Sequence, residues 1–212
     1  MKKRPWLIVL VLVILVGGFV FIQRSAGKKS LGETAYFKME PTATPTSALL
    51  QIDTQKTYQA ILKTTIGDIE IVLNASATPV TVNNFVSLSR KNFYDNTVFH
   101  RVIRGFMIQG GDPKGDGTGG PGYTFADEPF SGEYERGIVA MANAGPDTNG
   151  SQFFIMQSDY DLPKKYVIFG KVTGGIEVVD KIASSPVVNN SFGEPSKPVN
   201  PVLIKSVEVI ER

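Results

Sequence analysis

The sequence contains no cysteine and a single histidine, His100. Without cysteine the chain has no disulfide bonds, no zinc sites built on thiolates and no cysteine nucleophile. A serine hydrolase triad would have to use His100, and no Gly-x-Ser-x-Gly motif presents a serine nucleophile. We therefore expect no metal site and no cofactor. We interpret His100 as a partly buried ring with one of its nitrogens hydrogen-bonded.

The chain also lacks a large excess of one charge, because 22 Lys and Arg residues are balanced by 20 Asp and Glu residues. Residues 1–57 hold 8 basic and 3 acidic residues, so residues 58–212 hold 14 basic and 17 acidic ones. A nucleic-acid-binding domain needs a basic face that neutralises phosphates. The acidic excess of 58–212 therefore argues against nucleic acid as a partner. The apolar content of 42% is enough to form a core.

One long apolar run lies near the N-terminus. Trp6–Ile22 contains 17 residues without a charge, between Lys2-Lys3-Arg4 on one side and Arg24 on the other. A helix of this length spans roughly 26 Å at about 1.5 Å per residue, against a hydrocarbon core of about 30 Å. We predict that residues 1–22 form an uncleaved signal anchor that crosses the membrane as a helix.

The alternative for this segment is a cleaved signal peptide, whose apolar run is shorter and ends at small residues. Here the run continues through Phe19–Ile22, and small residues follow at Ser25-Ala26-Gly27, so the anchor is favoured. Basic residues lie on both sides, and the N-terminal amine tips the orientation toward an N-terminus inside the cell. The C-terminal domain is then expected outside the cytoplasmic membrane, or secreted if the segment is cleaved.

Residues 23–57 show no sustained apolar period and include the Pro- and Thr-rich stretch Pro41–Ser47. Such a composition predicts a flexible linker. The alternative for its last part is an amphipathic helix around Ala48–Gln55, where three aliphatic residues occur close together. We place the start of the folded domain at residue 58.

From residue 58 onward the pattern is that of short strands. Gln59–Thr65 and Ile69–Leu73 flank the turn residues Ile66-Gly67-Asp68 and predict a hairpin. A last strand is predicted around Val207 and Val209. Further strands are predicted at Phe99–Ile103, Phe106–Gln109, Gly137–Ala140, Phe153–Met156 and Tyr166–Lys171. Many short strands separated by Gly, Pro and Asn are typical of an all-β barrel or sandwich.

Two helices are predicted between these strands. The first begins with Thr78 as N-cap and Pro79 at its first position, and it ends near Ser89. Its apolar positions, spaced i, i+3 and i+4, are Val82, Phe85 and Val86. The second helix follows Gly174-Gly175, and its apolar positions are Ile176, Val179, Ile182 and Ala183. Each helix is expected to cover an apolar face of the barrel.

Two glycine- and aspartate-containing patterns are interpreted as ordinary loop sequence. Gly115-x-Gly117-x-x-Gly120 matches a dinucleotide fingerprint by letter, but Pro121-Gly122 follows instead of a helix. Asp112 with the later Asp116-Gly117 resembles part of a calcium loop, but the distal glutamate is missing.

Two stretches carry the features that point to a function. Phe99–Asp112 reads FHRVIRGFMIQGGD, and Met141–Ile155 reads MANAGPDTNGSQFFI. They combine a cation, several amides and apolar side chains, with neither a metal ligand set nor an evident nucleophile. Such a combination suits holding a peptide more than cleaving it. Together the two stretches resemble those of cyclophilins.

Arg101 is the cation that this combination singles out. An arbitrary arginine would be a surface residue in a weak ion pair. A regular strand would place Phe99 and Arg101 on one face and His100 and Val102 on the other. The neighbouring Phe106, Met107 and Gln109 favour a pocket with an apolar floor and an amide wall, to which Asn143 and Gln152 add amides and Phe154 adds a ring.

The resemblance to cyclophilins covers residues 58–212. It implies a closed eight-stranded antiparallel barrel capped by two α-helices, to which the predicted N-terminal transmembrane helix is added. It also implies peptidyl-prolyl cis-trans isomerase activity, with proline-containing peptides and unfolded or exported proteins as partners. A proline-binding chaperone or scaffold module with incidental isomerase activity is the alternative, and retention of Arg101 favours the enzyme because binding alone requires only the pocket.

The resemblance further implies a role for individual residues. The arginine of the Phe-His-Arg motif is catalytic in the family, and Arg101 occupies that place here. The residues that match the proline-ring pocket are Phe106, Met107 and Phe154, those that match the groove for the peptide backbone are Gln109, Ala142 and Asn143, and those that match the far rim are Leu162 and Tyr166.

One departure from the family pattern concerns this rim. Relatives often have tryptophan before the residue that matches Leu162, whereas this chain has Asp161 there and no tryptophan after Trp6. The segment Met156–Lys165 is also one residue shorter than in many relatives. Asp161 offers neither an indole N–H nor a flat apolar surface, so we expect weak binding of the cyclic peptide cyclosporin.

Overall fold

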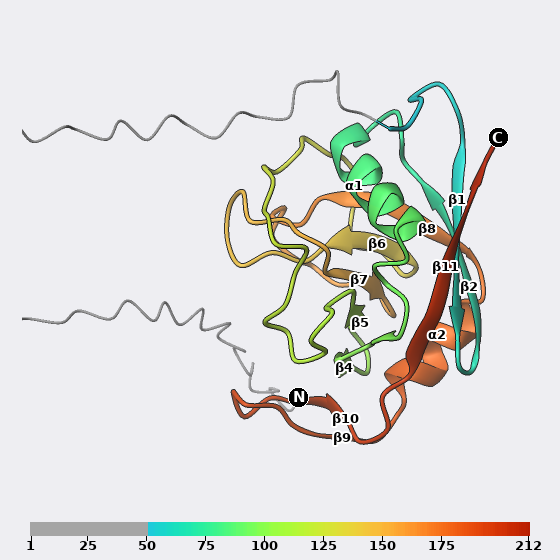
Figure 1. Ribbon diagram of the computed structural model, residues 1–212. Helices are drawn as coiled ribbons and strands as arrows, with labels where there is room; N and C mark the ends of the chain where they lie inside the picture. Colours follow the sequence, from blue (N-terminus) through green and yellow to red (C-terminus); the bar gives the residue numbers. More distant parts are fainter. Residues whose placement is uncertain (1–50) are drawn as a thin grey trace, which may run out of the picture. The chain divides into compact units, whose positions relative to one another are not determined.

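The computed structural model describes residues 51–212, which form a nine-stranded sheet, a two-stranded hairpin and two helices (Figure 1). The elements in chain order are β1 (Tyr58–Thr64), β2 (Gly67–Leu73), α1 (Pro79–Arg90), β3 (Thr97–Val98), β4 (Arg101–Ile103), β5 (Met107–Gly110), β6 (Ile138–Met141), β7 (Phe153–Met156), β8 (Ile168–Gly174), α2 (Ile176–Ala183), β9 (Val187–Asn189), β10 (Pro195–Pro198) and β11 (Leu203–Glu211). The prediction of a mainly β domain with two helices is confirmed.

The strands of the large sheet follow the order β3-β11-β1-β2-β8-β6-β7-β5-β4, and all its pairings are antiparallel. The sheet curls, but its end strands β3 and β4 do not pair with each other, so the expected closed eight-stranded barrel is wrong. The physical reason is that β3 and β4 are successive parts of one short segment. Its first part is hydrogen-bonded to β11 and its second part to β5, so the two end strands follow each other along the chain instead of lying side by side.

The two residues between β3 and β4 break the expected alternation of faces. Phe99 donates its backbone N–H to the Val202 carbonyl, whereas His100 donates to the Gln109 carbonyl, at 3.1 and 3.0 Å. The segment thus changes partner at this point. As a result Phe99 and Val102, which regular alternation would separate, lie in the same hydrophobic cluster.

Most predicted elements are found within one or two residues of their expected positions, including the β1–β2 hairpin, β7 and both helices. The sequence did not predict β3, β9 and β10. These strands have two to four residues each, which is too short for an alternating pattern to be recognised. Prolines at both ends of β10 also obscure its strand character.

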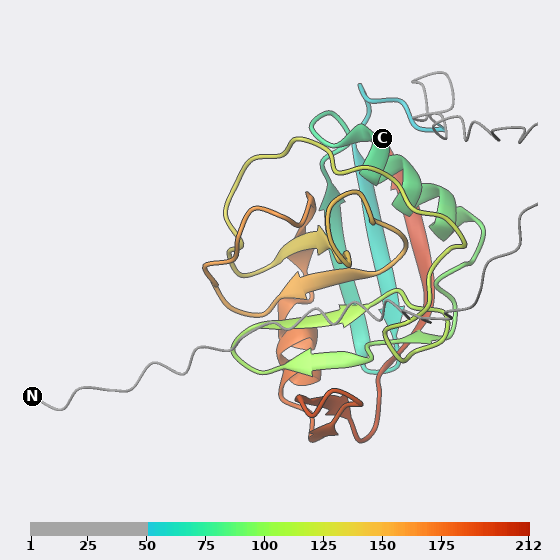
Figure 2. The same ribbon diagram turned by 90° about the vertical axis from the view of Figure 1, so that its left-hand side faces the viewer.

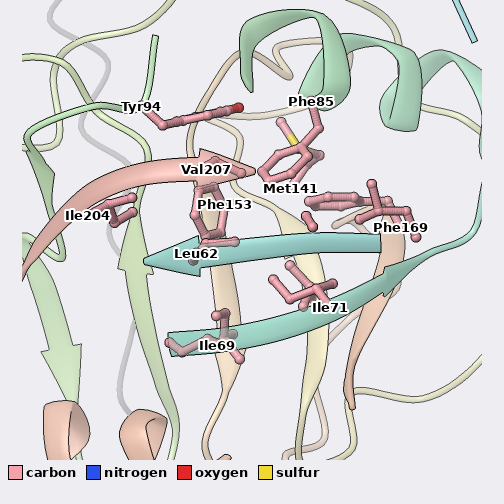
Figure 3. Close-up of a cluster of buried hydrophobic side chains, with 14 of the residues drawn as sticks. Leu62, Ile69, Ile71, Phe85, Tyr94, Met141, Phe153, Phe169, Ile204 and Val207 are labelled. Carbon is pink, nitrogen blue, oxygen red and sulfur yellow. The ribbon is translucent and has the colours of Figure 1, made fainter. Parts of the chain in front are cut away.

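The main hydrophobic cluster lies between the sheet and the helices, and Figure 3 shows its aromatic centre. Phe85 of α1 contacts three rings that come from distant parts of the chain. The distances between ring centroids are 5.1 Å to Tyr94, 5.6 Å to Phe153 and 5.3 Å to Phe169. All four rings are fully buried, so this contact fixes α1 against β7 and β8. The other helix, α2, contacts β2, β4 and β5.

The start of α1 is held by a residue that its own sequence does not contain. The Thr78 side chain bonds back to the Asn74 carbonyl and does not cap the helix. Instead the Glu128 carboxylate accepts the backbone N–H groups of Val80 and Thr81 at 2.8 and 2.6 Å. These first N–H groups of a helix have no partner within it, and a negative charge there is favourable. Glu128 therefore fastens the long loop before β6 to α1.

Residues 51–57 form no helix and pack against the domain. Ile52 belongs to the main hydrophobic cluster, and Thr57 exchanges two backbone hydrogen bonds with Arg212, at 2.9 and 3.0 Å. The predicted anchor at 1–22 and the linker up to residue 50 lie outside the described residues. Neither of the two helices within 51–212 is long and apolar enough to cross a membrane.

Candidate active site

A second apolar cluster lies on the other face of the strands that build the main core. Along β7, Phe153 belongs to the main cluster, whereas Phe154 belongs to the second. The same alternation separates Ile108 from Met107 on β5, as expected for side chains that point to opposite faces of a strand. The buried members of this second cluster are Met107, Tyr134, Ala140, Phe154, Met156 and Ile168. We call it the site cluster.

Partly exposed side chains surround the site cluster and give it an accessible apolar surface. They include four residues predicted for the site, which are Phe106, Ala142, Leu162 and Tyr166. The ring of Tyr166 packs edge-on against Phe154 with 5.5 Å between centroids. The predicted proline pocket and its far rim are thus brought together, although up to 60 residues separate their members along the chain.

The polar side of the site consists of three side chains joined by hydrogen bonds, those of Gln152, Gln109 and Arg101. Gln152 donates both of its amide hydrogens to the carbonyls of Gly117 and Gly119, at 3.0 and 2.9 Å. Its oxygen must then accept, and it accepts from Gln109 Nε2 at 2.9 Å. This leaves Gln109 Oε1 as an acceptor for Arg101 Nη1 at 3.4 Å. The direction of each amide therefore follows from the fixed carbonyls at the end of the chain.

Arg101 lies directly opposite Gln109 in the β4–β5 register, and its Nη1 is 4.0 Å from the sulfur of Met107. The strand pairing thus places the guanidinium at the border of the site cluster. The other edge of the guanidinium binds Glu194, with Nε–Oε2 and Nη2–Oε1 distances of 2.7 Å. These hydrogen bonds lower the pKa of the Glu194 carboxyl.

Sequence reasoning missed Glu194 as a partner of Arg101. The two residues are 93 positions apart, and Glu194 stands between Gly193 and Pro195 in a segment with no strand pattern. No signal in the sequence joins them, because the contact depends on where the β9–β10 hairpin packs. The hairpin contacts β4 (Figure 2).

Asn143 is used to hold the rim together. Its amide nitrogen donates to the Lys165 carbonyl at 2.7 Å, and its amide oxygen accepts the backbone N–H of Gly145 at 3.3 Å. The neighbouring Ala142 donates its N–H to the Gln152 carbonyl at 2.9 Å. Asn143 therefore ties the loop after β6 to the loop before β8, on which Tyr166 lies.

His100 is buried, and neither ring nitrogen has a hydrogen-bond partner of ordinary geometry within residues 51–212. Burial lowers the pKa of His100, and the charge of Arg101 adds to this effect while Asp112 opposes it. Interaction with the Val98 backbone also raises the pKa of His100, and the expectation of one hydrogen-bonded nitrogen stays a prediction.

Asp112, considered above as part of a calcium-like pattern, organises the loop that supports Gln152. Its carboxylate accepts the backbone N–H groups of Lys114, Asp116 and Gly117. A side chain at Gly119 would bring a Cβ to within 1.9 Å of Asp112 Oδ1, so this position requires glycine. Among the described residues, no group of three or more His, Asp or Glu side chains could hold a metal ion.

Comparisons with known proteins agree on one family. A family model described as cyclophilin type peptidyl-prolyl cis-trans isomerase matches residues 59–209. Peptidyl-prolyl cis-trans isomerase B of Streptomyces anulatus is 50% identical over 173 residues, which cover 72% of this chain and 97% of the relative. Peptidyl-prolyl cis-trans isomerase-like 3 of Dictyostelium discoideum is 44% identical over 155 residues, which cover 70% of this chain and 92% of the relative.

A solved structure agrees with these sequences. The Cryptosporidium parvum cyclophilin type peptidyl-prolyl cis-trans isomerase, in the presence of the dipeptide Ala-Pro, aligns with a TM-score of 0.64 and 38% identity. The alignment covers 73% of this chain and 99% of that one.

Proposed function

The chain belongs to the cyclophilin-type peptidyl-prolyl cis-trans isomerase family, and we propose that it acts on exported or cell-surface proteins from an anchor formed by residues 1–22. The family activity is rotation about X-Pro peptide bonds. The assignment of Arg101 as its catalytic residue, the binding roles of the pocket residues and the location are parts of the proposal.

The uncatalysed rotation is slow because the X-Pro amide is planar. Resonance gives the bond a rotation barrier of about 18–20 kcal/mol, so an X-Pro bond isomerises in tens to hundreds of seconds. Twisting the bond localises the lone pair on the proline nitrogen. This nitrogen is a poor hydrogen-bond acceptor in the planar state and a good one when twisted. A donor aimed at it therefore stabilises the transition state more than the ground state.

Arg101 is the donor that we assign to this step. Its Nη1 lies at the border between the apolar site cluster and the amide of Gln109, and this juxtaposition carries the proposal. Arginine stays charged at any working pH, so no proton has to move. Shortening a step of about 100 s to about 10 ms requires roughly 5.5 kcal/mol. A charge-assisted hydrogen bond and anchoring of the proline ring and its neighbouring carbonyl together have this magnitude.

The remaining site residues are assigned to binding. Phe106, Met107 and Phe154 form the apolar surface for the proline ring. Gln109, Gln152, Ala142 and Asn143 are assigned to the groove for the peptide backbone, where Gln152 holds the Gln109 amide in place. Leu162 and Tyr166 border the pocket on the far side. The Ala-Pro dipeptide named with the Cryptosporidium relative supports a proline-containing peptide as the ligand class.

The proposed location depends on the N-terminal run. Trp6–Ile22 is uncharged and is separated from the domain by about 30 residues. An anchored enzyme with this order of segments would meet proteins as they emerge on the outer side of the membrane. Unfolded chains there contain X-Pro bonds in both isomers, which fold slowly without catalysis.

The assignment of Arg101 is tested by turnover of a short X-Pro peptide with wild type, Arg101→Ala and Arg101→Lys. We expect kcat/KM to fall roughly 100-fold in Arg101→Ala, as for removal of a single transition-state donor, while peptide binding changes little. Near wild-type kcat/KM in Arg101→Ala would contradict the catalytic role and favour a binding module.

The location is tested separately by carbonate extraction of membranes that contain the full chain. We expect the full chain to remain in the membrane fraction, and a variant that begins at residue 51 to be soluble and fully active. Recovery of a shortened chain with a new N-terminus near Ala26 or Gly27 would replace the anchor by a cleaved signal peptide.

A further inference from the structure

The geometry points to Glu194 as a positioning residue for the isomerase reaction, which fixes the guanidinium of Arg101 so that Nη1 faces the substrate pocket. This inference rests on the proposed catalytic role of Arg101. Glu194 acts through the arginine, to which its carboxylate is hydrogen-bonded.

The contact uses one complete edge of the guanidinium. Oε2 and Oε1 of Glu194 accept from Nε and Nη2 of Arg101, both at 2.7 Å. Two parallel bonds of this kind fix the plane of the guanidinium and not only its position. The nitrogen left outside the pair is Nη1, which is 4.0 Å from Met107 Sδ. The ion pair therefore selects which N–H groups are directed to the apolar surface.

Glu194 is itself held in place by the turn that joins β9 to β10. The side-chain oxygen of Asn190 accepts the backbone N–H groups of Phe192 and Glu194, at 2.9 and 3.0 Å. Its nitrogen donates to Ser196 Oγ at 3.1 Å and to Glu194 Oε2 at 3.3 Å. Gly193 adopts a positive φ of 81° within this turn. The turn and the Asn190 side chain thus hold the carboxylate next to the arginine.

The exposure of the Arg101–Glu194 pair indicates how much the pair contributes to folding stability. Both side chains are 31% exposed, and ion pairs of such partial exposure add little to folding stability. Fixing the direction of a catalytic group has a larger effect, because a small misplacement strongly reduces the rate. The role that remains for this pair is orientation of Arg101.

The negative charge of Glu194 does not prevent Arg101 from stabilising the twisted substrate. The acceptor in the twisted substrate is a neutral nitrogen lone pair, so the reaction needs a directed N–H group more than a strong positive field. Arginine without a partner on its outer edge would rotate among several directions, since its side chain is long and flexible. Gln109 alone, at 3.4 Å from Nη1, provides a single long contact.

The kinetic test compares Glu194→Gln and Glu194→Ala with wild type. The charge-matched control is Glu208→Gln, which removes a surface ion pair with Lys63 between β11 and β1. We expect kcat to fall about tenfold in both Glu194 variants, with KM within twofold of wild type, and no change in the control. Thermal unfolding of each variant shows whether the fold is retained.

A spectroscopic readout keeps the inference testable apart from turnover. In the wild type the bidentate pair should hinder rotation about the Arg101 Nε–Cζ bond, giving separate NMR signals for the Nη1 and Nη2 hydrogens. We expect these signals to merge in Glu194→Ala, and to remain separate in Glu208→Gln.

The outcomes separate this inference from the proposed function. Unchanged kcat or merged signals already in the wild type, with Arg101→Ala inactive, would overturn the role of Glu194 and leave that of Arg101 standing. Full activity of Arg101→Ala would overturn both.

Discussion

The ring of Tyr160 packs against the ring of Phe106, with 4.5 Å between their centroids and an angle of 39° between their planes. Phe106 belongs to the proposed proline pocket, and Tyr160 lies on the loop where the sequence departs from the family pattern. The loop is fixed there by a hydrogen bond from the Tyr160 N–H to the Tyr134 carbonyl at 3.0 Å. An aromatic surface therefore borders the pocket one position before the place where many relatives have tryptophan.

The contact between Tyr160 and Phe106 bears on the prediction of weak cyclosporin binding. Tyr160 supplies aromatic surface, but the indole N–H donor of the relatives has no counterpart at Asp161, which is exposed. Loss of one hydrogen bond and part of an aromatic contact costs about 2–3 kcal/mol, or roughly 30- to 150-fold in affinity. We expect weak inhibition of the wild type, tighter inhibition of Asp161→Trp, and still weaker inhibition of Tyr160→Ala in a titration of isomerase activity. Tight inhibition of the unmodified protein would show that this departure is unimportant.

Phe154→Ala should weaken peptide binding as well as stability, because it removes a side chain that is only 5% exposed from the site cluster. The loss of stability is expected to be about 3–5 kcal/mol. The matched control is Phe153→Ala, which removes the same side chain from the opposite face of β7. Urea unfolding should show a similar loss for both variants, and peptide binding by the folded fraction should fall only in Phe154→Ala. Equal peptide binding by both variants would show that Phe154 is not part of the proline pocket.

Stability is expected to decrease in mild acid because of His100. Burial holds the pKa of His100 below its ordinary value of 6.5, so the unfolded chain binds the proton more readily than the folded one. The free energy of unfolding is therefore unaffected by His100 above about pH 6.5. It decreases as the pH drops below this value, and the decrease levels off below the folded-state pKa of His100. Urea unfolding between pH 7.5 and 5.5 should show this loss in wild type and not in His100→Gln. The same pH dependence in both proteins would assign it to other groups.

The start of the folded domain can be tested by comparing variants that begin at residue 51 and at residue 58. The shorter one lacks Ile52, which is buried in the main cluster, and Thr57, which exchanges backbone hydrogen bonds with Arg212. Burial of an isoleucine side chain contributes roughly 1.5–3 kcal/mol. We expect the shorter variant to unfold at a lower temperature in calorimetry while its kcat/KM is retained. Equal unfolding temperatures would place the boundary at residue 58, as the sequence suggested.

The two sequence stretches Phe99–Asp112 and Met141–Ile155 identified the family without any structure, because they contain most of the site residues in a fixed order. The pairing of Arg101 with Gln109 is local, since these residues lie on adjacent strands joined by a short turn. Helix α1 could also be predicted, because its cap position, proline and apolar spacing all lie within one short segment. Such features depend on neighbours in the chain, and the sequence alone determines them.

Only the tertiary structure decided the features that depend on distant segments. The end strands β3 and β4 are successive parts of one segment that pairs first with β11 and then with β5, and no local pattern reveals where a strand changes its partner. Likewise Glu128 reaches α1 across 48 positions, and Glu194 reaches Arg101 across 93. A charged residue has the same local appearance whether it faces solvent or a partner. Its role is fixed by the packing of the whole chain, which brings remote side chains to within hydrogen-bond distance.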